Sequence, residues 1–238
     1  MDSNSDNYKK ALIRIRELYG KINKNSDLFS SKNRVMSDYQ NLFSSPNVST
    51  IGKEEFVEFL HFKNNHHWTS LDRQAKNLTS DMVALRKALS ELVDGSRPIS
   101  NRIDNLTHVK GLGEGIFTPI LLIASNQKFA VWNSKSAGFL SKYGIKPSSS
   151  GKSTGRYYEE VNMLFSKLSK DANLDLWTLD ALFHYDLYIQ KIPEEIESRK
   201  KIWKSLKMSS DGETAVSDLF AKGLRIGQRQ LFLHLNSF

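Results

Sequence analysis

Apolar residues recur at intervals of three and four along most of this chain, and this spacing constrains its fold more than any other feature. Within residues 8–22 the apolar positions are Leu12, Ile15, Leu18 and Tyr19, which share one face of an α-helix. The same spacing predicts further helices at residues 56–62, 82–92, 156–168 and 174–189. No long alternation of apolar and polar residues appears, so we predict an all-α fold.

Two stretches depart from the helical pattern. Residues 147–155 (PSSSGKSTG) are low in complexity and predict an exposed loop between helices. After Ile192 the composition shifts, with a proline start followed by the basic stretch at residues 199–207. We therefore predict a helical domain over residues 1–191 and a basic C-terminal helical extension over residues 192–238. The sequence leaves open whether this extension packs on the domain or clasps a partner.

The composition narrows the class of protein. Hydrophobic residues make up 39% of the 238 positions, enough to bury a sizeable core. Cysteine is absent, which excludes disulfides, thiolate metal sites and a cysteine nucleophile. No apolar run reaches the length of a membrane span, and the polar N-terminal residues lack the apolar stretch of a signal peptide. We expect a cytoplasmic monomer without a membrane partner.

The net charge of +8 favours a polyanionic partner, because each lysine or arginine placed near a phosphate releases condensed counterions. Two stretches that resemble known motifs do not identify this partner further. The GKS at residues 151–153 resembles the end of a phosphate-binding loop, but Lys146 stands where that pattern needs glycine. On a helix His66 and His67 would point about 100° apart, without a carboxylate at the usual partner spacing. We expect neither a nucleotide cofactor nor a bound metal.

The most informative stretch is residues 109–124 (VKGLGEGIFTPILLIA). Gly111 and Gly113 flank one apolar residue directly ahead of an apolar helix. Such a turn points backbone amides outward at a helix N-terminus, where free N–H groups and the helix dipole favour a phosphate. Gly115 would contribute a further amide, and Lys110 a positive charge. Plain turn chemistry, with no ligand, also explains two glycines at a helix start.

The residues after this hairpin carry a family resemblance. A turn and a short extended stretch lead to Asn133, which stands at the N-cap position of a helix closed by Gly144. This order resembles the helix-hairpin-helix superfamily of DNA glycosylases, the relatives of endonuclease III and adenine glycosylase. Their hairpin reads Leu-Pro-Gly-Val-Gly-x-Lys/Tyr, and a Val-Asp pair opens the next helix. Gly115 stands at the Lys/Tyr position and Asn133 at the aspartate position, with matching spacing. The resemblance covers residues 109–144 and implies a glycosylase-like helical fold that binds double-stranded DNA.

Two departures from the family pattern affect the chemistry that the resemblance implies. Family members with lyase activity attack the sugar with the hairpin lysine, and Gly115 has no side chain to do so. The family aspartate stabilises positive charge on the sugar and helps to activate water, and Asn133 lacks its negative charge. Asn133 is a catalytic candidate that could orient water through its carbonyl. It is also explained as a helix N-cap alone.

The stretch KNNHHWTSLDR, which ends at Arg73, holds amide, imidazole and indole side chains at the end of an apolar helix. A glycosylase must flip the target nucleotide, fill the gap that it leaves and read the base. Trp68 suits stacking, and Asn65 and His66 suit base-edge contacts or gap filling. We add Trp132 to this base pocket and Arg73 to the DNA contacts. Alternatively, Trp68 is a core residue and the rest is a solvated helix start.

Asp180 lies inside the last strongly apolar helix, where a buried carboxylate is costly unless it is paired or used. It could pair with Arg73 or Arg156. It could instead line the base pocket and supply the charge that Asn133 lacks, which makes it the second catalytic candidate. His184 lies one turn further on the same face.

Together these features predict a monofunctional DNA glycosylase that hydrolyses the N-glycosidic bond of a modified base and leaves an abasic site. Because the family lysine and aspartate are absent, we expect an unusual substrate, such as a hypermodified base of phage DNA in a defence role. The alternative is a catalytically inactive module of the same fold that binds damaged or modified DNA. A third alternative is a helical scaffold whose hairpin contacts protein.

Overall fold

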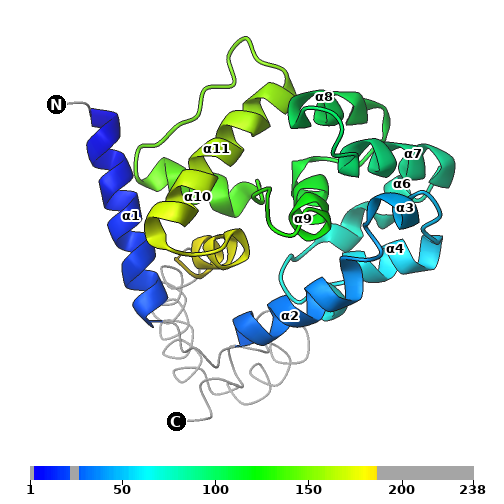
Figure 1. Cartoon of the computed structure of the whole chain (residues 1–238), viewed down its shortest axis with the longest axis horizontal. Coiled ribbons are helices and arrows are strands. Elements are labelled where there is room, and N and C mark those ends of the chain that lie inside the picture. The colour runs from blue at the N-terminus through cyan, green and yellow to red at the C-terminus, as the bar shows by residue number, and fades with distance from the viewer. Residues whose placement is uncertain (1–2, 22–26, 187–238) are drawn as a thin grey trace, which may run out of the picture. The chain divides into compact units, whose positions relative to one another are not determined.

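The computed structural model describes residues 3–21 and 27–186, and every regular element within these ranges is a helix (Figure 1). The elements are α1 (Ser3–Lys21), α2 (Asp27–Tyr39), α3 (Ser45–Val48), α4 (Lys53–Leu60), α5 (Phe62–Asn65), η1 (Leu71–Gln74), α6 (Ala75–Leu78), α7 (Met82–Val93), α8 (Ile99–Asp104), η2 (Asn105–His108), α9 (Glu114–Ala124), α10 (Ser134–Lys142) and α11 (Thr154–Ala172). A further helix occupies residues 176–186. The all-α prediction is confirmed for these residues, which belong to the compact unit Met1–Leu187. The extension predicted at residues 192–238 lies outside the described residues.

Side-chain caps mark the starts of α7, α10 and α11. The Asp81 carboxylate caps α7 by accepting hydrogen bonds from the amides of Val83 and Ala84 at 3.0 and 2.9 Å. The single helix expected at residues 56–62 is instead two, because His61 adopts an extended backbone (φ −74°, ψ 129°) between α4 and α5. Helix propensity does not predict this break, because the residues on both sides of His61 are compatible with a helix and the apolar run is short.

The GKS stretch at residues 151–153 leads into α11 and provides its N-cap, Ser153. The Ser153 hydroxyl donates to Asp104 at 2.7 Å and accepts a hydrogen bond from the Arg156 amide at 3.3 Å, which caps α11. The Lys152 ammonium pairs with Glu160 in the second turn of that helix. The loop expected at residues 147–155 therefore ends at Ser153, and the last two residues belong to α11.

α11 and α8 pack so closely that a glycine is required between them. A Cβ atom on Gly155 would lie 1.9 Å from the backbone oxygen of Ser100, far inside van der Waals contact. The absence of a side chain at this position lets the start of α11 rest directly on α8. This contact fixes the end of α11 from which Tyr157 and Tyr158 project.

α9 forms the centre of the described unit. All residues from Ile116 to Ile123 are buried, so this helix is apolar on every side rather than along one stripe. Figure 1 shows the helix near the middle of the unit, with α7 and α8 on one side and α10 on another. Because α9 begins at the predicted hairpin, its burial holds the hairpin turn in a fixed position.

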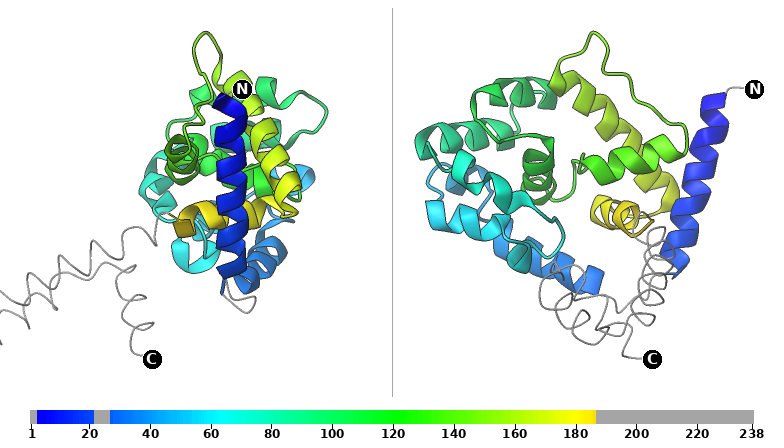
Figure 2. Two further views of the ribbon diagram at one scale, coloured as in Figure 1. Left: turned by 90° about the vertical axis from the view of Figure 1, so that its left-hand side faces the viewer. Right: turned by 180° about the vertical axis from the view of Figure 1, so that it is seen from behind.

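α1 is attached to the unit through side-chain contacts with distant helices. Its Arg14 donates to one oxygen of the buried Asp186 at 2.7 and 2.8 Å, and Lys142 of α10 donates to the other oxygen at 2.8 Å. The Tyr8 hydroxyl donates to Asp171 of α11 at 2.7 Å. Figure 2 shows α1 running along one side of the unit. Tyr19, expected on the buried face of this helix, is 37% exposed because it lies at the edge of the stripe made by Ala11, Ile15 and Leu18.

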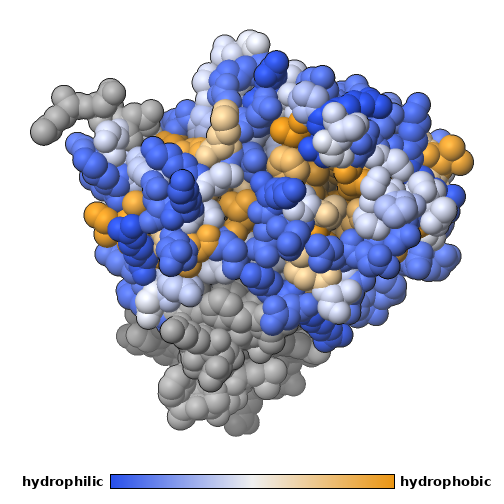
Figure 3. All heavy atoms as spheres, in the orientation of Figure 1, coloured by the Kyte–Doolittle hydropathy of each residue, from blue (hydrophilic) through white to orange (hydrophobic). Residues whose placement is uncertain are grey.

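The surface of the unit is largely polar. Figure 3 shows polar side chains over most of the visible face, with apolar side chains between them in small patches. The large apolar side chains that are exposed include Ile13, Val83 and Met163, and scattered residues of this kind are normal on a protein surface. No helix in the described part of the chain combines the length and apolarity that crossing a membrane would need.

Candidate functional site

A cleft of about 940 Å³ is lined by segments that are far apart in the sequence. Its walls come mainly from residues 67–74, the hairpin before α9, the start of α10 and the helix at residues 176–186, and Ser149 and Tyr157 complete the lining. Of the residues that the sequence singled out, the cleft collects Trp68, Gly111, Gly113, Gly115, Trp132, Asn133 and Asp180. The predicted hairpin, the Asn133 position and the buried carboxylate thus share one hollow.

The hairpin turn presents backbone amides to this cleft. Gly111 has a φ of +92°, a left-handed conformation that favours glycine, and Gly113 is the N-cap of α9. The amides of Gly113, Glu114 and Gly115 have no acceptor among the described residues, whereas the Ile116 amide already donates to Gly113 at 2.9 Å. A Cβ at Gly113 or Gly115 would meet nothing within 4 Å, so this side of the turn is open.

The two basic residues predicted to contact DNA lie outside the lining of the cleft. Lys110 is exposed and precedes Gly111 on the turn, and Arg73 is exposed on η1. Lys135 of α10, which the sequence analysis did not select, does line the cleft and is half-buried. It has no ion-pair partner among the described residues.

Side-chain hydrogen bonds, rather than a sheet, hold the extended stretch that leads to Asn133. The Thr118 hydroxyl on α9 accepts a hydrogen bond from the Trp132 amide at 3.0 Å and donates to the backbone oxygen of Glu114 at 2.6 Å. Further back, the Tyr158 hydroxyl donates to the backbone oxygen of Ala130 at 2.6 Å. Because Thr118 bonds to both segments, it fixes the position of Trp132 relative to the hairpin.

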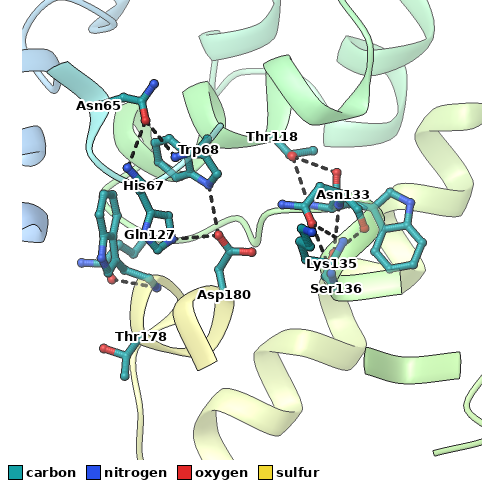
Figure 4. Close-up of polar contacts among 12 residues, drawn as sticks. Asn65, His67, Trp68, Thr118, Gln127, Asn133, Lys135, Ser136, Thr178 and Asp180 are labelled. Atoms are coloured by element: carbon teal, nitrogen blue, oxygen red, sulfur yellow. Dashed lines mark hydrogen bonds and ion pairs between the residues drawn. The ribbon is translucent and has the colours of Figure 1, made fainter. Parts of the chain in front are cut away.

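Asn133 is the N-cap of α10. Its side-chain oxygen accepts hydrogen bonds from the amides of Lys135 and Ser136 at 2.8 and 3.1 Å, and the Ser136 hydroxyl accepts from the Asn133 amide at 2.9 Å (Figure 4). The capping role that the sequence left open is therefore present. The carbonyl that was expected to orient water is occupied by these two amides, and the side-chain NH₂ has no partner among the described residues.

Asp180 lies on the opposite wall and pairs with neither predicted arginine. One carboxylate oxygen, Oδ2, accepts hydrogen bonds from His67 Nε2 and Trp68 Nε1, each at 3.0 Å. The prediction of an arginine partner is wrong: Arg156 pairs with Glu159, and Arg73 is exposed. The side chain is 6% exposed, and its other oxygen, Oδ1, has no partner among the described residues. Figure 4 shows Oδ1 turned toward the side on which Asn133 lies.

His67 is held in place by a ring stack and by hydrogen bonds. Its ring stacks on Trp177 with centroids 4.5 Å apart and an interplanar angle of 27°. Its backbone amide, together with that of Trp68, donates to the side-chain oxygen of Asn65 at 3.0 and 2.8 Å. From the sequence, His67 was a candidate only for metal binding. No group of three or more histidine, aspartate or glutamate side chains suited to a metal exists in residues 3–21 and 27–186.

Asn65 and His66 do not face the cleft, contrary to their predicted role in base contacts. Asn65 is fully buried, and its side-chain NH₂ donates to the backbone oxygens of Phe59 and His61 at 3.1 and 3.2 Å. All of its hydrogen-bonding capacity thus serves the turn after α4. His66 adopts a left-handed conformation (φ 52°) at the end of α5 and is not among the lining residues.

The two predicted tryptophans line the cleft as walls. Trp68 is 5% exposed and packs edge-on against Trp177 at 5.1 Å, while Trp132 is 7% exposed and packs edge-on against Tyr157 at 5.8 Å. Side chains this deeply buried cannot enter a duplex as a wedge. They can form the apolar faces of a pocket that receives a flipped base.

Glu114 is a site residue that the sequence analysis missed. It lines the cleft between the two exposed hairpin amides, and burial raises the pKa of its carboxyl above the ordinary glutamate value. Its nearness also adds to the raised pKa of Tyr157, which is mainly due to burial. A negatively charged side chain is unexpected between two glycines whose amides are predicted to bind a phosphate. This unfavourable pairing of charges could have identified Glu114 as a functional candidate from the sequence.

His184 completes the titratable groups of the cleft. Desolvation by the surrounding protein lowers the pKa of its imidazole, and the electrostatic effect of His67 and Lys135 lowers it further, against a smaller opposite effect of Asp180. Both causes favour the neutral ring at physiological pH. A neutral imidazole can accept as well as donate a hydrogen bond, so His184 can face either kind of polar group on a ligand.

Comparison with models of protein families, with curated proteins and with solved structures gives no match for this chain.

Proposed function

We propose that this protein is a DNA N-glycosylase that removes a modified base by hydrolysis. The observation that carries the proposal is the shared cleft, in which unpaired hairpin amides, two carboxylates and two tryptophan walls surround one space. Glycosylases need these components together: a phosphate anchor, a negative charge near the sugar and a stacking surface for a flipped base. A volume of about 940 Å³ is at the large end for ligand sites and suits a bulky modified base.

The proposed binding mode runs across the cleft from one wall to the other. A DNA phosphate would accept hydrogen bonds from the amides of Gly113 and Gly115, which are free of protein partners. The sugar, bonded directly to that phosphate, would then lie beside Glu114 and Asn133. The base lies beyond the sugar and would reach the wall made by Trp68 and Asp180.

In this arrangement Glu114 supplies the negative charge that Asn133 lacks. Ionised Glu114 would take a proton from water, and the water oxygen would bond to the C1′ carbon of the sugar. The C1′–N bond breaks, its electron pair leaves with the base, and the base gains a proton from solvent. The free side-chain NH₂ of Asn133 can bind the sugar or the water, while its carbonyl remains bound to α10.

A binding module without catalysis is the second candidate. It is favoured by the capping bonds of the Asn133 carbonyl and by the half-buried Glu114 carboxylate, which would repel a phosphate at the adjacent amides when it is ionised. Both candidates require salt-sensitive DNA binding in the same cleft, so only catalysis separates them.

The deciding experiment is base release from duplexes that carry a panel of modified bases, scored as strand breaks after hot alkali. We expect breaks that depend on alkali, and a loss of about 10²-fold or more in Glu114→Gln. Asn133→Ala and Asp180→Ala test the other two cleft residues, and Lys87→Ala, on an exposed site outside the cleft, is the matched control. Salt-sensitive binding without breaks on any duplex would favour the binding module, and no DNA binding would reject both candidates.

A further inference from the structure

We propose that Asp180 selects bases that carry an exocyclic amino group, the cytosine and adenine classes, over bases with a carbonyl oxygen at the same ring position. This inference rests on the proposed function, because it assigns the base-reading wall of the same cleft. It also gives Asp180 the base-pocket role instead of the catalytic one.

The two oxygens of this carboxylate have different surroundings. Oδ2 accepts from both His67 Nε2 and Trp68 Nε1 at 3.0 Å, whereas Oδ1 has no partner among the described residues. The side chain is 6% exposed and belongs to the lining of the cleft. Oδ1 is therefore a buried acceptor within the wall of the cleft, on the side of the carboxylate that is turned toward Asn133 (Figure 4).

A buried acceptor without a donor is energetically unfavourable, and an ionised carboxylate can only accept. A ligand that places an N–H group at Oδ1 removes this penalty. Cytosine and adenine carry an amino group on the edge where uracil, thymine and guanine carry an oxygen, and carboxylates pair with the cytosine amino group. An oxygen in that position would face Oδ1 acceptor to acceptor and would be rejected.

The indole of Trp68 makes this inference testable by a single substitution. Indole Nε1–H can only donate, so the atom that faces it must be an acceptor. In Asp180→Asn the amide oxygen must therefore occupy the Oδ2 position beside Trp68 and His67. The amide NH₂ then occupies the position of Oδ1 and presents donors to the cleft. The variant should accept a carbonyl oxygen where the parent protein accepts an amino group.

The experiment compares two probes that differ only at this ring position and its neighbouring ring nitrogen: 5-hydroxymethylcytosine and 5-hydroxymethyluracil. Each is placed in the same flanking sequence, as a single strand and opposite its pairing partner. We expect the parent protein to bind or release the cytosine probe on the order of tenfold better. In Asp180→Asn this ratio should fall below one.

Asp175→Asn is the matched control. Asp175 begins the same helical region, pairs with Lys32 and does not line the cleft, so its substitution should leave the probe ratio unchanged. A parent preference for the uracil probe, or a ratio that Asp180→Asn does not change in a folded variant, would overturn the inference and leave the glycosylase proposal standing. If no DNA binds at all, the proposed function fails and this inference fails with it. If both probes bind but neither base is released, the ratio of the two affinities tests the inference in the same way.

Discussion

The indole Nε1 of Trp68 donates a 3.0 Å hydrogen bond to Oδ2 of Asp180, and this bond joins two segments separated by more than a hundred residues. Both residues are buried, at 5% exposure each. The bond helps to fix which carboxylate oxygen is held by Trp68 and His67 and which is left without a partner among the described residues. It also closes one wall of the cleft by tying the turn after α5 to the helix at residues 176–186.

Trp68→Phe should destabilise the protein because it removes this donor while keeping an aromatic ring. Hydrogen bonds to charged groups contribute about 1.5–3 kcal/mol, and we expect a loss of that size in the free energy of unfolding measured with urea. Trp132→Phe is the control, since Trp132 lines the same cleft at 7% exposure and its indole N–H has no protein partner among the described residues. Equal losses in the two variants would show that ring volume, not the hydrogen bond, is responsible.

Glu114→Gln should stabilise the protein at neutral pH. Burial raises the pKa of Glu114 in the folded state above its unfolded value. The contribution of this group to stability is therefore complete below the unfolded pKa and is lost as pH rises through the folded pKa. Glutamine avoids the loss, so the thermal midpoint of the variant should exceed that of the parent at pH 7.

The two midpoints should converge as pH falls below the ordinary glutamate pKa, where both side chains are neutral. Glu54→Gln serves as a control because Glu54 lies in the first turn of α4 but is exposed. A parent protein that is as stable as Glu114→Gln at every pH would contradict the burial of a charge in the cleft.

The rate of base release should decrease as pH is lowered, because the proposed general base is the ionised form of Glu114. Protonation of a group with a raised pKa removes the base at a pH above the ordinary glutamate value. We expect the acid limb of kcat/KM to lie above that value and to be absent from the residual activity of Glu114→Gln. An unchanged acid limb in the variant would assign the titration to another group.

Lys135→Ala should weaken DNA binding about equally for all sequences. Lys135 lines the cleft beside Asn133 and has no ion-pair partner among the described residues, so it is free to contact a phosphate. Removing one phosphate contact should lower the slope of log affinity against log salt by about one. Lys87→Ala, on an exposed face outside the cleft, should leave the slope as it is. Equal salt slopes for the parent and Lys135→Ala would show that Lys135 does not contact a phosphate.

Gly155→Ala should be strongly destabilising because the new Cβ would overlap the Ser100 backbone oxygen at 1.9 Å. Overpacking of this kind costs about 1–3 kcal/mol and at times more, and backbone atoms cannot move aside as a flexible side chain can. Gly20→Ala in α1 is the control, since nothing lies within 4 Å and alanine favours a helix by about 0.5–1 kcal/mol. Thermal unfolding of the two variants should move the midpoint in opposite directions.

Helix caps and turns that are formed by residues adjacent in the sequence could be predicted from the sequence. The cap of α7 at Asp81, the N-cap of α10 at Asn133 and the turn at Gly111 each follow from a side chain and backbone within a few residues of one another. The apolar content of residues 116–123 likewise predicts that α9 is buried. The break at His61 is the exception, because both flanking segments are compatible with a continuous helix.

The sequence by itself thus determined the helical class and the local geometry of the hairpin, since short-range hydrogen bonds and apolar periodicity are written into adjacent residues. Only the tertiary structure decided that Asp180 meets Trp68 and His67 rather than an arginine, that Asn65 is buried in a turn, and that Glu114 is desolvated in the cleft. These outcomes depend on how distant helices pack. The partner of a buried charge and the solvent around a carboxylate are properties of that packing, and no local pattern encodes them.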